Sequence, residues 1–297
     1  MKNALLRFYR KLILNKWNIG FVSFDETLFN KDYLTIKWLK HNYKDRWFAD
    51  PFILNVSDSR YEVLVEEFYD PIHRGRISKL VIDRKNLKLL DIKVLLELDT
   101  HLSYPAIQKI NDEVYVYPEN SETGKLVLYK YDKVLESLTP EAVIIHEPLT
   151  DAILSMNFGK PILISTKIPY QNKDILSIYE SDSWKGPYSL ASTINFSDFS
   201  ARGAGRLFSL QGKLIRPAQD CNGSYGRGLV FQELVKNENG TFDFKEIKRF
   251  FPNSWKYNLG MHTFDSFQNI GVIDGRGYRN PIIGHLINFV RTLITKV

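Results

Sequence analysis

Five stretches that lie far apart in the chain each place polar side chains beside an apolar, strand-like run. These side chains are Asp50, Ser103, Tyr104, Asp151, Arg206 and His262. A carboxylate accepts hydrogens from sugar hydroxyls, an arginine pairs with phosphate or carboxylate through two parallel hydrogen bonds, and a tyrosine offers a flat face to a pyranose ring. This combination suits a carbohydrate, provided that the fold brings the five stretches together.

Carboxyl groups are the candidates for proton transfer. The catalytic candidates are Asp50, Asp151, Glu67 and Glu119. A glutamate that donates a proton needs a pKa raised by burial or by a neighbouring carboxylate. Only one of Glu66 and Glu67 can face inward, because side chains alternate along a strand. Pro51 is expected to hold Asp50 in an extended conformation.

A basic group lies around residues 202–216, and two interpretations of it stay open. Its members are Arg202, Arg206 and Arg216. With Asp220 they could form a buried salt-bridge network. Alternatively they could bind an anionic group such as a sugar-nucleotide phosphate, a uronate or a lipid-linked diphosphate. His101 and His262 are further candidates for substrate binding, and His262 could transfer a proton near pH 7; both could instead be ordinary core residues.

A regular repeat would position these side chains. The markers Asp50, Pro105, Asp151, Gly205 and Thr263 are 55, 46, 54 and 58 residues apart. Each unit runs from a small or polar cluster through an apolar run and a turn to further β-rich runs. A period of about fifty residues with about four strands is typical of a β-propeller blade. The sequence therefore predicts an all-β fold, a five-bladed β-propeller over residues 17–275 without an internal domain boundary.

The ends of the propeller should close on each other. The fifth unit runs out of strand-forming sequence after Asp274. We expect its missing strands to come from residues 18–23 and the segment after them, which would leave no open sheet edge. The innermost strands of a propeller converge on a central channel, so the polar residues at their ends would share one mouth.

Both ends of the chain, residues 1–16 and 276–297, are predicted to form short amphipathic helices. They could rest on an anionic membrane leaflet, or they could pack on the propeller or on a partner chain. No stretch reaches the roughly 20 consecutive apolar residues that a membrane span needs. Basic residues interrupt the apolar core that a secretory signal would have. We therefore expect a cytoplasmic protein that could lie at the inner membrane as a peripheral protein.

The composition excludes several classes of protein. The 297 residues are 44% hydrophobic and 25% charged, which excludes a disordered or collagen-like chain. A net charge of +6 favours an anionic partner or a membrane surface but is too diffuse to indicate nucleic acid. The one cysteine, Cys221, excludes an intrachain disulfide and a cysteine-based zinc site. We expect no cofactor and no metal, although carboxylates together with His262 could accept an ion.

Several motifs together resemble a known family. They are Trp47-Phe-Ala-Asp-Pro-Phe52, His101-Leu-Ser-Tyr-Pro105, Asp151-Ala152, Gly205-Arg206 and Arg216-Pro-Ala-Gln-Asp-Cys221 with Tyr225-Gly226. From about Trp17 to Asp274 the chain resembles the propeller domain of glucosamine inositolphosphorylceramide transferases and its stand-alone bacterial relatives. That domain is similar in turn to five-bladed glycoside hydrolase propellers, including family 43. The resemblance implies that Asp50 stands where the hydrolases have a general base, that Asp151 tunes the acid, and that Glu67 is preferred to Glu66.

The family resemblance implies a propeller that handles glycans. The third carboxylate of the hydrolases has no clear counterpart, because the fourth blade opens with arginines. We therefore expect a glycosyltransferase-like protein of cell-surface polysaccharide or glycolipid biosynthesis that binds a sugar, a sugar phosphate or a lipid-linked saccharide. The alternatives are a glycoside hydrolase with paired carboxylates and a non-catalytic glycan-binding module that serves a partner glycosyltransferase. Carboxyl groups about 5 to 9.5 Å apart would favour hydrolysis, whereas carboxylates locked in ion pairs with arginine would favour binding or structure.

Overall fold

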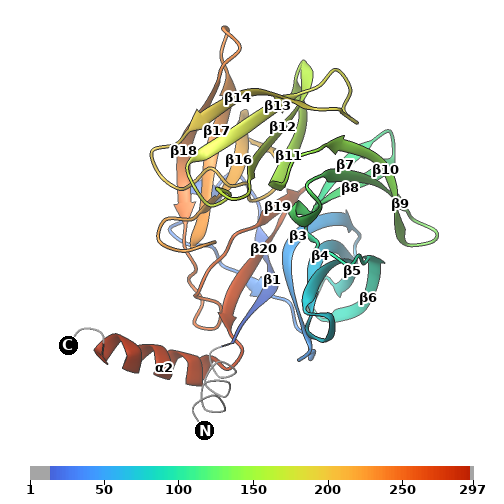
Figure 1. The fold of residues 1–297 in the computed structure, drawn as a ribbon. Coiled ribbons are helices and arrows are strands. Elements are labelled where there is room, and N and C mark those ends of the chain that lie inside the picture. The colour runs from blue at the N-terminus through green and yellow to red at the C-terminus, as the bar shows by residue number, and fades with distance from the viewer. Residues whose placement is uncertain (1–13, 295–297) are drawn as a thin grey trace.

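The computed structural model describes residues 14–294, with side chains to residue 290, as five four-stranded sheets arranged around a central axis (Figure 1). Blade one contains β3 (Arg46–Val56), β4 (Arg60–Tyr69), β5 (Arg74–Asp83) and β6 (Leu89–Leu96). Blade two contains β7 (Ser103–Ile110), β8 (Glu113–Glu119), β9 (Leu126–Asp132) and β10 (Ser137–Ile145). Blade three contains β11 (Leu149–Phe158), β12 (Lys160–Lys167), β13 (Ile175–Glu180) and β14 (Ser189–Asn195).

The last two blades complete the ring. Blade four contains β15 (Phe208–Leu210), β16 (Lys213–Asp220), β17 (Gly228–Lys236) and β18 (Phe242–Phe250). Blade five combines β19 (Phe264–Phe267) and β20 (Ile270–Tyr278) with β1 (Asn15–Ser23) and β2 (Lys37–Trp38). The predicted five-bladed β-propeller is therefore confirmed.

Blade five closes the ring as the sequence predicts. β1 pairs antiparallel with β20, from Asn15 opposite Tyr278 to Ser23 opposite Ile270. β2 then pairs with β1 at the outer edge of the same sheet. Strands from the two ends of the propeller thus share one sheet, so that unfolding one end must also open the other.

Neighbouring residues of β4 show how the blades pack. Val63 and Val65 belong to an apolar layer shared with blade five, which also contains Ile19 of β1. Leu64 lies between them in sequence but belongs to a layer shared with blade two, which contains Leu102. Both faces of the sheet are therefore buried, which explains why inner strands are continuous apolar runs rather than alternating ones.

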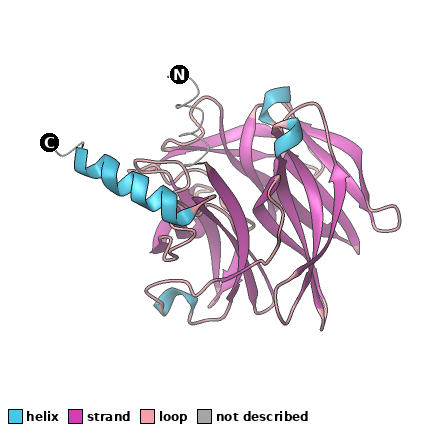
Figure 2. Ribbon diagram, turned by 90° about the horizontal axis from the view of Figure 1, so that it is seen from below, coloured by secondary structure: helices cyan, strands magenta, loops and turns pink. Residues whose placement is uncertain are grey.

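The innermost strands lie next to one another around the axis, because β3 contacts β7, β19 and β20. Polar residues near the starts of these strands therefore come together from different blades. The mostly strand architecture is visible in Figure 2, which shows α2 (Pro281–Ile294) as a helix that projects beside the blades. Within residues 14–294, three short 3-10 helices lie at Leu28–Asn30, Asp70–Ile72 and Ser121–Thr123.

The predicted terminal helices are described only in part. The prediction for residues 1–16 falls largely on residues outside the described range, and Asn15 and Lys16 belong to β1. At the other end β20 continues to Tyr278, so α2 begins at Pro281 rather than at residue 276. Among the described residues, no helix combines the length and the apolar character that crossing a bilayer requires.

Candidate functional site at the channel mouth

Asp50, Tyr104 and Asp151 occupy equivalent places in three successive blades. Each lies near the start of an innermost strand, where a β-bulge shifts the pairing register. Their φ values are 49°, 45° and 47°, in the left-handed region that costs a non-glycine residue about 1–2 kcal/mol. The prediction that Pro51 keeps Asp50 extended is wrong, because the bulge and hydrogen bonds from neighbouring blades hold the left-handed conformation.

Backbone amides of one blade donate to carboxylates of the preceding blade around the ring. The Tyr104 amide donates to Asp50 Oδ2 at 3.0 Å, and the Asp151 amide donates to Glu119 Oε2 at 3.0 Å. The Asp50 amide donates to Asp274 Oδ2 of blade five at 3.2 Å. Each carboxylate is thus oriented by rigid strands, which fixes its position at the mouth.

Asp50, His262, Thr263 and Asp274 form one half of the mouth, which we call the histidine cluster. Thr263 Oγ1 donates to Asp50 Oδ1 at 2.7 Å, and His262 Nε2 lies 3.6 Å from the same oxygen. His262 Nδ1 lies 2.5 Å from Asp274 Oδ2. The amides of His262 and Thr263 donate to Asp274 Oδ1 at 2.8 and 3.1 Å. None of the four residues is more than 4% exposed.

Burial changes the ionisation of the histidine cluster. It raises the pKa of Asp50 to about 7, although the positive charge of His262 opposes the shift. Burial also disfavours the charged form of His262, but Asp274 and Asp50 together raise its pKa to about 9. Near neutral pH the imidazole therefore keeps its proton while Asp50 can both accept and release one, which is the property that a general base needs.

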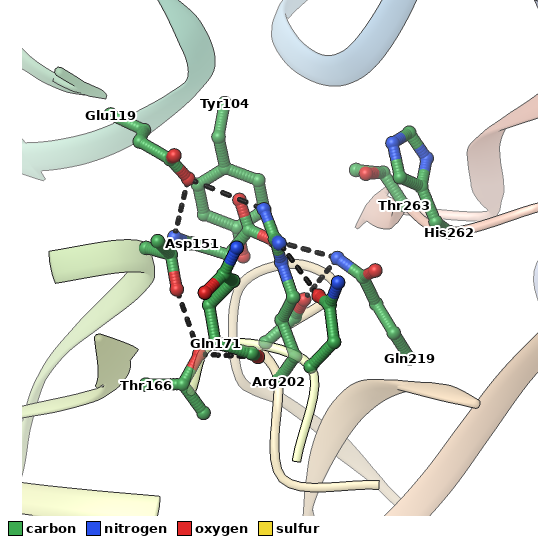
Figure 3. Close-up of polar contacts among 12 residues, drawn as sticks. Tyr104, Glu119, Asp151, Thr166, Gln171, Arg202, Gln219, His262 and Thr263 are labelled. Atoms are coloured by element: carbon green, nitrogen blue, oxygen red, sulfur yellow. Dashed lines mark hydrogen bonds and ion pairs between the residues drawn. The ribbon is translucent and has the colours of Figure 1, made fainter. Parts of the chain in front are cut away.

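Glu119, Asp151 and Arg202 form the other half of the mouth, the arginine cluster (Figure 3). Arg202 Nε lies 2.5 Å from Asp151 Oδ2, and Arg202 Nη2 lies 3.5 Å from Glu119 Oε2. Gln219 Nε2 also donates to Asp151 Oδ2, at 2.6 Å. Burial, and then the charge of Asp151, raises the pKa of Glu119 well above its usual value, against the effect of Arg202. A guanidinium stays charged at any physiological pH, so this half of the mouth keeps a permanent positive charge at Arg202.

One aromatic ring, Tyr225, borders both clusters, and a second, Trp17, borders the histidine cluster. The Tyr225 ring lies 5.0 Å from the Arg202 guanidinium and meets the His262 ring edge-on at 5.2 Å. The Trp17 indole stacks on the His262 ring with centroids 4.0 Å apart. Flat rings beside carboxylates are the groups expected to contact a sugar, since one presents a face and the other accepts hydroxyl hydrogens.

The neighbouring glutamates Glu66 and Glu67 of β4 lie in different surroundings. Glu67 is fully buried between Arg46 and Arg76, with oxygen–nitrogen distances of 2.7 and 3.0 Å. Glu66 lies 3.1 Å from His101 Nε2. After burial and the opposing His262, its charge is the next contribution to the raised pKa of Asp50. Glu67, the glutamate that the family resemblance favours, is therefore held by two arginines, whereas the charge of Glu66 reaches Asp50.

Arg206 lies on another carboxylate and not in the arginine cluster. It forms a two-bond ion pair with Asp265 of β19, at 2.7 and 2.6 Å. The same aspartate accepts from the Ile53 amide of β3 at 2.7 Å. These contacts tie blades one, four and five together along the channel, so Arg206 has a structural partner already.

Arg216 and Asp220 do not pair with each other. Arg216 is fully buried, donates to Gln232 Oε1 at 2.6 Å and to a backbone carbonyl, and has its pKa lowered to about 10 by burial. Asp220 instead pairs with Arg227 and Arg249, at 2.7 and 2.8 Å. The basic group of blade four thus separates into unrelated contacts, and Arg202 is its member in the arginine cluster.

Ser103 and Tyr104, the predicted pair, both belong to β7 but lie in different surroundings. Ser103 pairs in register with Glu119. Tyr104 is 1% exposed and packs edge-on against Phe52 at 4.9 Å. Its hydroxyl is buried and has no hydrogen-bond partner in the described part of the chain. The pair therefore reaches the site through the Tyr104 amide rather than through the phenol.

A metal ion has one candidate position among the described residues. Donor atoms of Asp50, His262 and Asp274 all lie within 4.8 Å of one another. A histidine must be deprotonated to bind a metal, whereas the two aspartates hold the proton on His262. A metal at this position would therefore compete with the protonated imidazole.

Sequence analysis missed several residues of the site. They are Trp17, Gln219, Tyr225 and Asp274. Asp274 ends an apolar run in the fifth unit as Glu119 does in the second, and that parallel could have identified it. Gln219 and Tyr225 lie inside a motif that carries the family resemblance. Trp17 carries no such signal, because its place depends on the closure of blade five.

Comparisons with known proteins agree with this description. A family model described as glucosamine inositolphosphorylceramide transferase 1, N-terminal, matches residues 34–275. The chain belongs to this family.

The Oryza sativa subsp. japonica protein named glucosamine inositolphosphorylceramide transferase 1 is 37% identical over 201 residues, which cover 65% of this chain and 27% of the relative. The Arabidopsis thaliana protein of the same name is 31% identical over 247 residues, which cover 76% of this chain and 32% of the relative. The chain thus spans less than a third of the length of these relatives.

Solved structures share the fold of this family member. A structure of RS223-beta-xylosidase has a TM-score of 0.53 at 13% identity, covering 72% of this chain and 80% of that one. An exo-beta-1,3-galactanase from Phanerochaete chrysosporium has a TM-score of 0.52 at 10% identity, covering 76% and 60%. At these identities the likeness shows the propeller fold, in agreement with the resemblance stated from the motifs.

Proposed function

We propose that this member of the family binds a sugar at the channel mouth and takes part in a glycosyltransferase-like step of glycolipid or polysaccharide biosynthesis. The observation that carries the proposal is the pKa of Asp50. Burial raises it to about 7, and the carboxyl group lies beside Thr263 and His262. The name of the plant relatives, which denotes a transferase, supports the class of reaction.

Asp50 would act as the general base of such a step. It would take the proton from an acceptor hydroxyl while that oxygen forms a bond to the anomeric carbon of an activated donor sugar, such as a sugar phosphate. The bond from the anomeric carbon to the leaving group then breaks, and its electron pair leaves with the leaving-group oxygen. The protonated His262, held by Asp274, favours the ionised form of Asp50 that must accept the proton.

The arginine cluster would position the sugar. Asp151 and Glu119 have oxygen lone pairs beyond those used by Arg202, and these can accept hydroxyl hydrogens. Tyr225 offers a ring between the two clusters. The ion pairs fix these acceptors in place, which also fits a glycan-binding module that serves a partner glycosyltransferase.

Hydrolysis is the second candidate, and one observation favours it. The raised pKa of Glu119 is what a general acid needs. However, Glu119 and Asp151 share one arginine, and blade four contributes Gln219 beside Asp151 instead of a carboxylate. Transfer or binding is therefore the better supported function.

The test is a binding and turnover screen with nucleotide sugars and lipid-linked saccharides, comparing the wild type with Asp50→Ala. We expect Asp50→Ala to lower affinity or turnover for the sugar by about tenfold or more, which corresponds to about 1.4 kcal/mol. Asp182→Ala removes an exposed aspartate of blade three and is the matched control. Full affinity and activity in Asp50→Ala would show that the site lies elsewhere. Release of free sugar without an acceptor would indicate hydrolysis, and binding without turnover would indicate a binding module.

We also propose that the protein works at the surface of a membrane, on its cytoplasmic side, where a lipid-linked saccharide would be available. The net charge of +6 supports this location, because an anionic leaflet attracts basic proteins.

A further inference from the structure

α2 faces the propeller with its least apolar side. Gly284 packs so closely on Tyr278 that a Cβ atom there would lie 2.2 Å from the Tyr278 ring. The His285 ring meets Tyr278 at 5.3 Å and Trp255 at 5.5 Å, and His285 Nε2 lies 2.9 Å from the Trp255 carbonyl oxygen. These contacts fix the rotation of the helix about its own axis.

The apolar stripe of α2 therefore points away from the blades. Its exposed members are Ile282, Ile283, Leu286, Phe289 and Val290. They recur at intervals of three and four residues, so they share one side of the helix. Leu286 and Phe289 are each 62% exposed. A surface helix of a globular protein normally buries such a stripe against the core, so this one is available to a partner.

A large basic groove begins where α2 begins. It has a volume of about 2220 Å³ and is lined by residues 277–280, directly before the helix, and by residues 14–18, 38–44 and 256–257 among others. Eight lysines and arginines line it, against two aspartates. This excess gives the groove a strongly positive potential.

Part of this positive charge has no internal partner. Lys40, Lys44, Lys88 and Arg279 are exposed and form no ion pair with another residue of the described range 14–294. The positive charge of the groove also acts on a histidine of the protein. Burial, and then the charges of groove residues such as Lys256, lowers the pKa of His41, which lines the groove, to about 4. An anion in the groove would relieve this repulsion.

We propose that the apolar stripe of α2 and the basic groove form one docking surface for an anionic lipid bilayer. The helix lies in the interface with its stripe among the acyl chains, and the groove cations meet lipid phosphates. This inference rests on the proposed membrane location but not on the sugar site.

We infer a bilayer because it would contact both the apolar stripe of α2 and the basic groove. A soluble phosphate would use the cations but leave the stripe exposed to water. A second copy of this chain could cover the stripe but would bring a second set of like charges to the groove. The surface also adjoins the site, because Trp17 both lines the groove and stacks on His262. A lipid phosphate in the groove would therefore lie beside the channel mouth.

The test is co-sedimentation of the full chain with vesicles of phosphatidylcholine alone or mixed with phosphatidylserine. We expect binding to the mixed vesicles to weaken by at least about tenfold in a groove variant that carries Lys40→Glu, Lys44→Glu and Lys88→Glu. A helix variant with Leu286→Ser and Phe289→Ser should weaken by a similar factor, because it loses buried apolar area. The matched control carries Lys125→Glu, Lys173→Glu and Lys245→Glu on other blades and should bind nearly as the wild type does.

Three results would overturn the docking surface. The first is equal binding of the wild type to both kinds of vesicle, and the second is unchanged binding of the groove variant. The third is a helix variant that binds like the wild type, which would indicate a groove for soluble anions. Asp50→Asn should leave vesicle binding unchanged, so a failure of the sugar site and a failure of the docking surface are distinguishable. Thermal unfolding of each variant confirms that it is folded.

Discussion

Asp50 and Asp151 stand in the same place in their blades but face different cations. Both lie in a β-bulge with a left-handed φ, 49° and 47°. Asp50 has His262 at 3.6 Å, whereas Asp151 has Arg202 at 2.5 Å. An imidazole can lose its charge near physiological pH and a guanidinium cannot. The repeat thus supplies one backbone position twice, and the two carboxylates differ in whether the charge of the neighbouring cation is permanent.

Removal of Arg202, the permanently charged partner of Asp151, should have the largest effect on stability. Arg202→Met leaves Asp151 and Glu119 buried without a compensating charge, so we expect the free energy of unfolding to fall by about 3–5 kcal/mol. Chemical denaturation measures this loss. Lys160→Met removes an exposed ion pair and should leave stability nearly unchanged. If Arg202→Met were as stable as this control, the ion pairs would not be what holds that half of the mouth.

The next largest effect should come from the acid that supports the histidine. Asp274→Asn keeps the shape of the side chain but removes the charge 2.5 Å from His262 Nδ1. We expect a loss of about 2–3 kcal/mol in the free energy of unfolding, because a buried charge-assisted contact is lost. The pKa of His262 should also fall, which NMR titration of the imidazole measures. An unchanged imidazole pKa would mean that Asp50 alone sets it.

The histidine cluster should make the stability of the protein depend on pH. The pKa of His262 is raised from 6.5 to about 9 in the folded protein, so its stabilising effect is complete below pH 6.5 and is lost as pH rises through 9. The raised pKa of Asp50 acts in the same direction, because the folded state binds its proton more tightly. We expect stability to fall by on the order of 1–3 kcal/mol between pH 6 and 10. Denaturation across this range should show a flatter decline in His262→Gln, and an equal decline in both proteins would contradict the assignment.

The fold was predictable because each blade begins with a small or polar cluster beside an apolar strand at a nearly constant interval. Asp50, Asp151 and His262 could therefore be expected at one mouth, since innermost strands converge. The choice between Glu66 and Glu67 could not be made from alternation alone. The β-bulge between Ala49 and Phe52 shifts the register, and register decides which neighbour faces the channel.

The ion-pair partners of the charged residues were harder to predict than the positions of these residues in the fold. Arg216 and Asp220 are four residues apart, yet they lie in different surroundings and pair with different groups. Ion pairs between blades depend on side-chain reach across a packed layer, which the order of residues does not encode. The same holds for α2, whose sequence predicts an amphipathic helix but not that Gly284 turns the apolar stripe outward.

The smallest expected effect on stability comes from the Thr263 hydroxyl, which contacts Asp50 but not Asp151. Thr263 Oγ1 donates to Asp50 Oδ1 at 2.7 Å, and this bond favours the ionised carboxylate. Thr263→Val should lower the free energy of unfolding by about 1 kcal/mol and raise the pKa of Asp50 further, whereas Thr263→Ser should keep both values. NMR titration of the Asp50 carboxyl separates the two variants. If Thr263→Val leaves that pKa unchanged, then burial and His262 alone set the ionisation of the general base, and Thr263 does not belong in the histidine cluster.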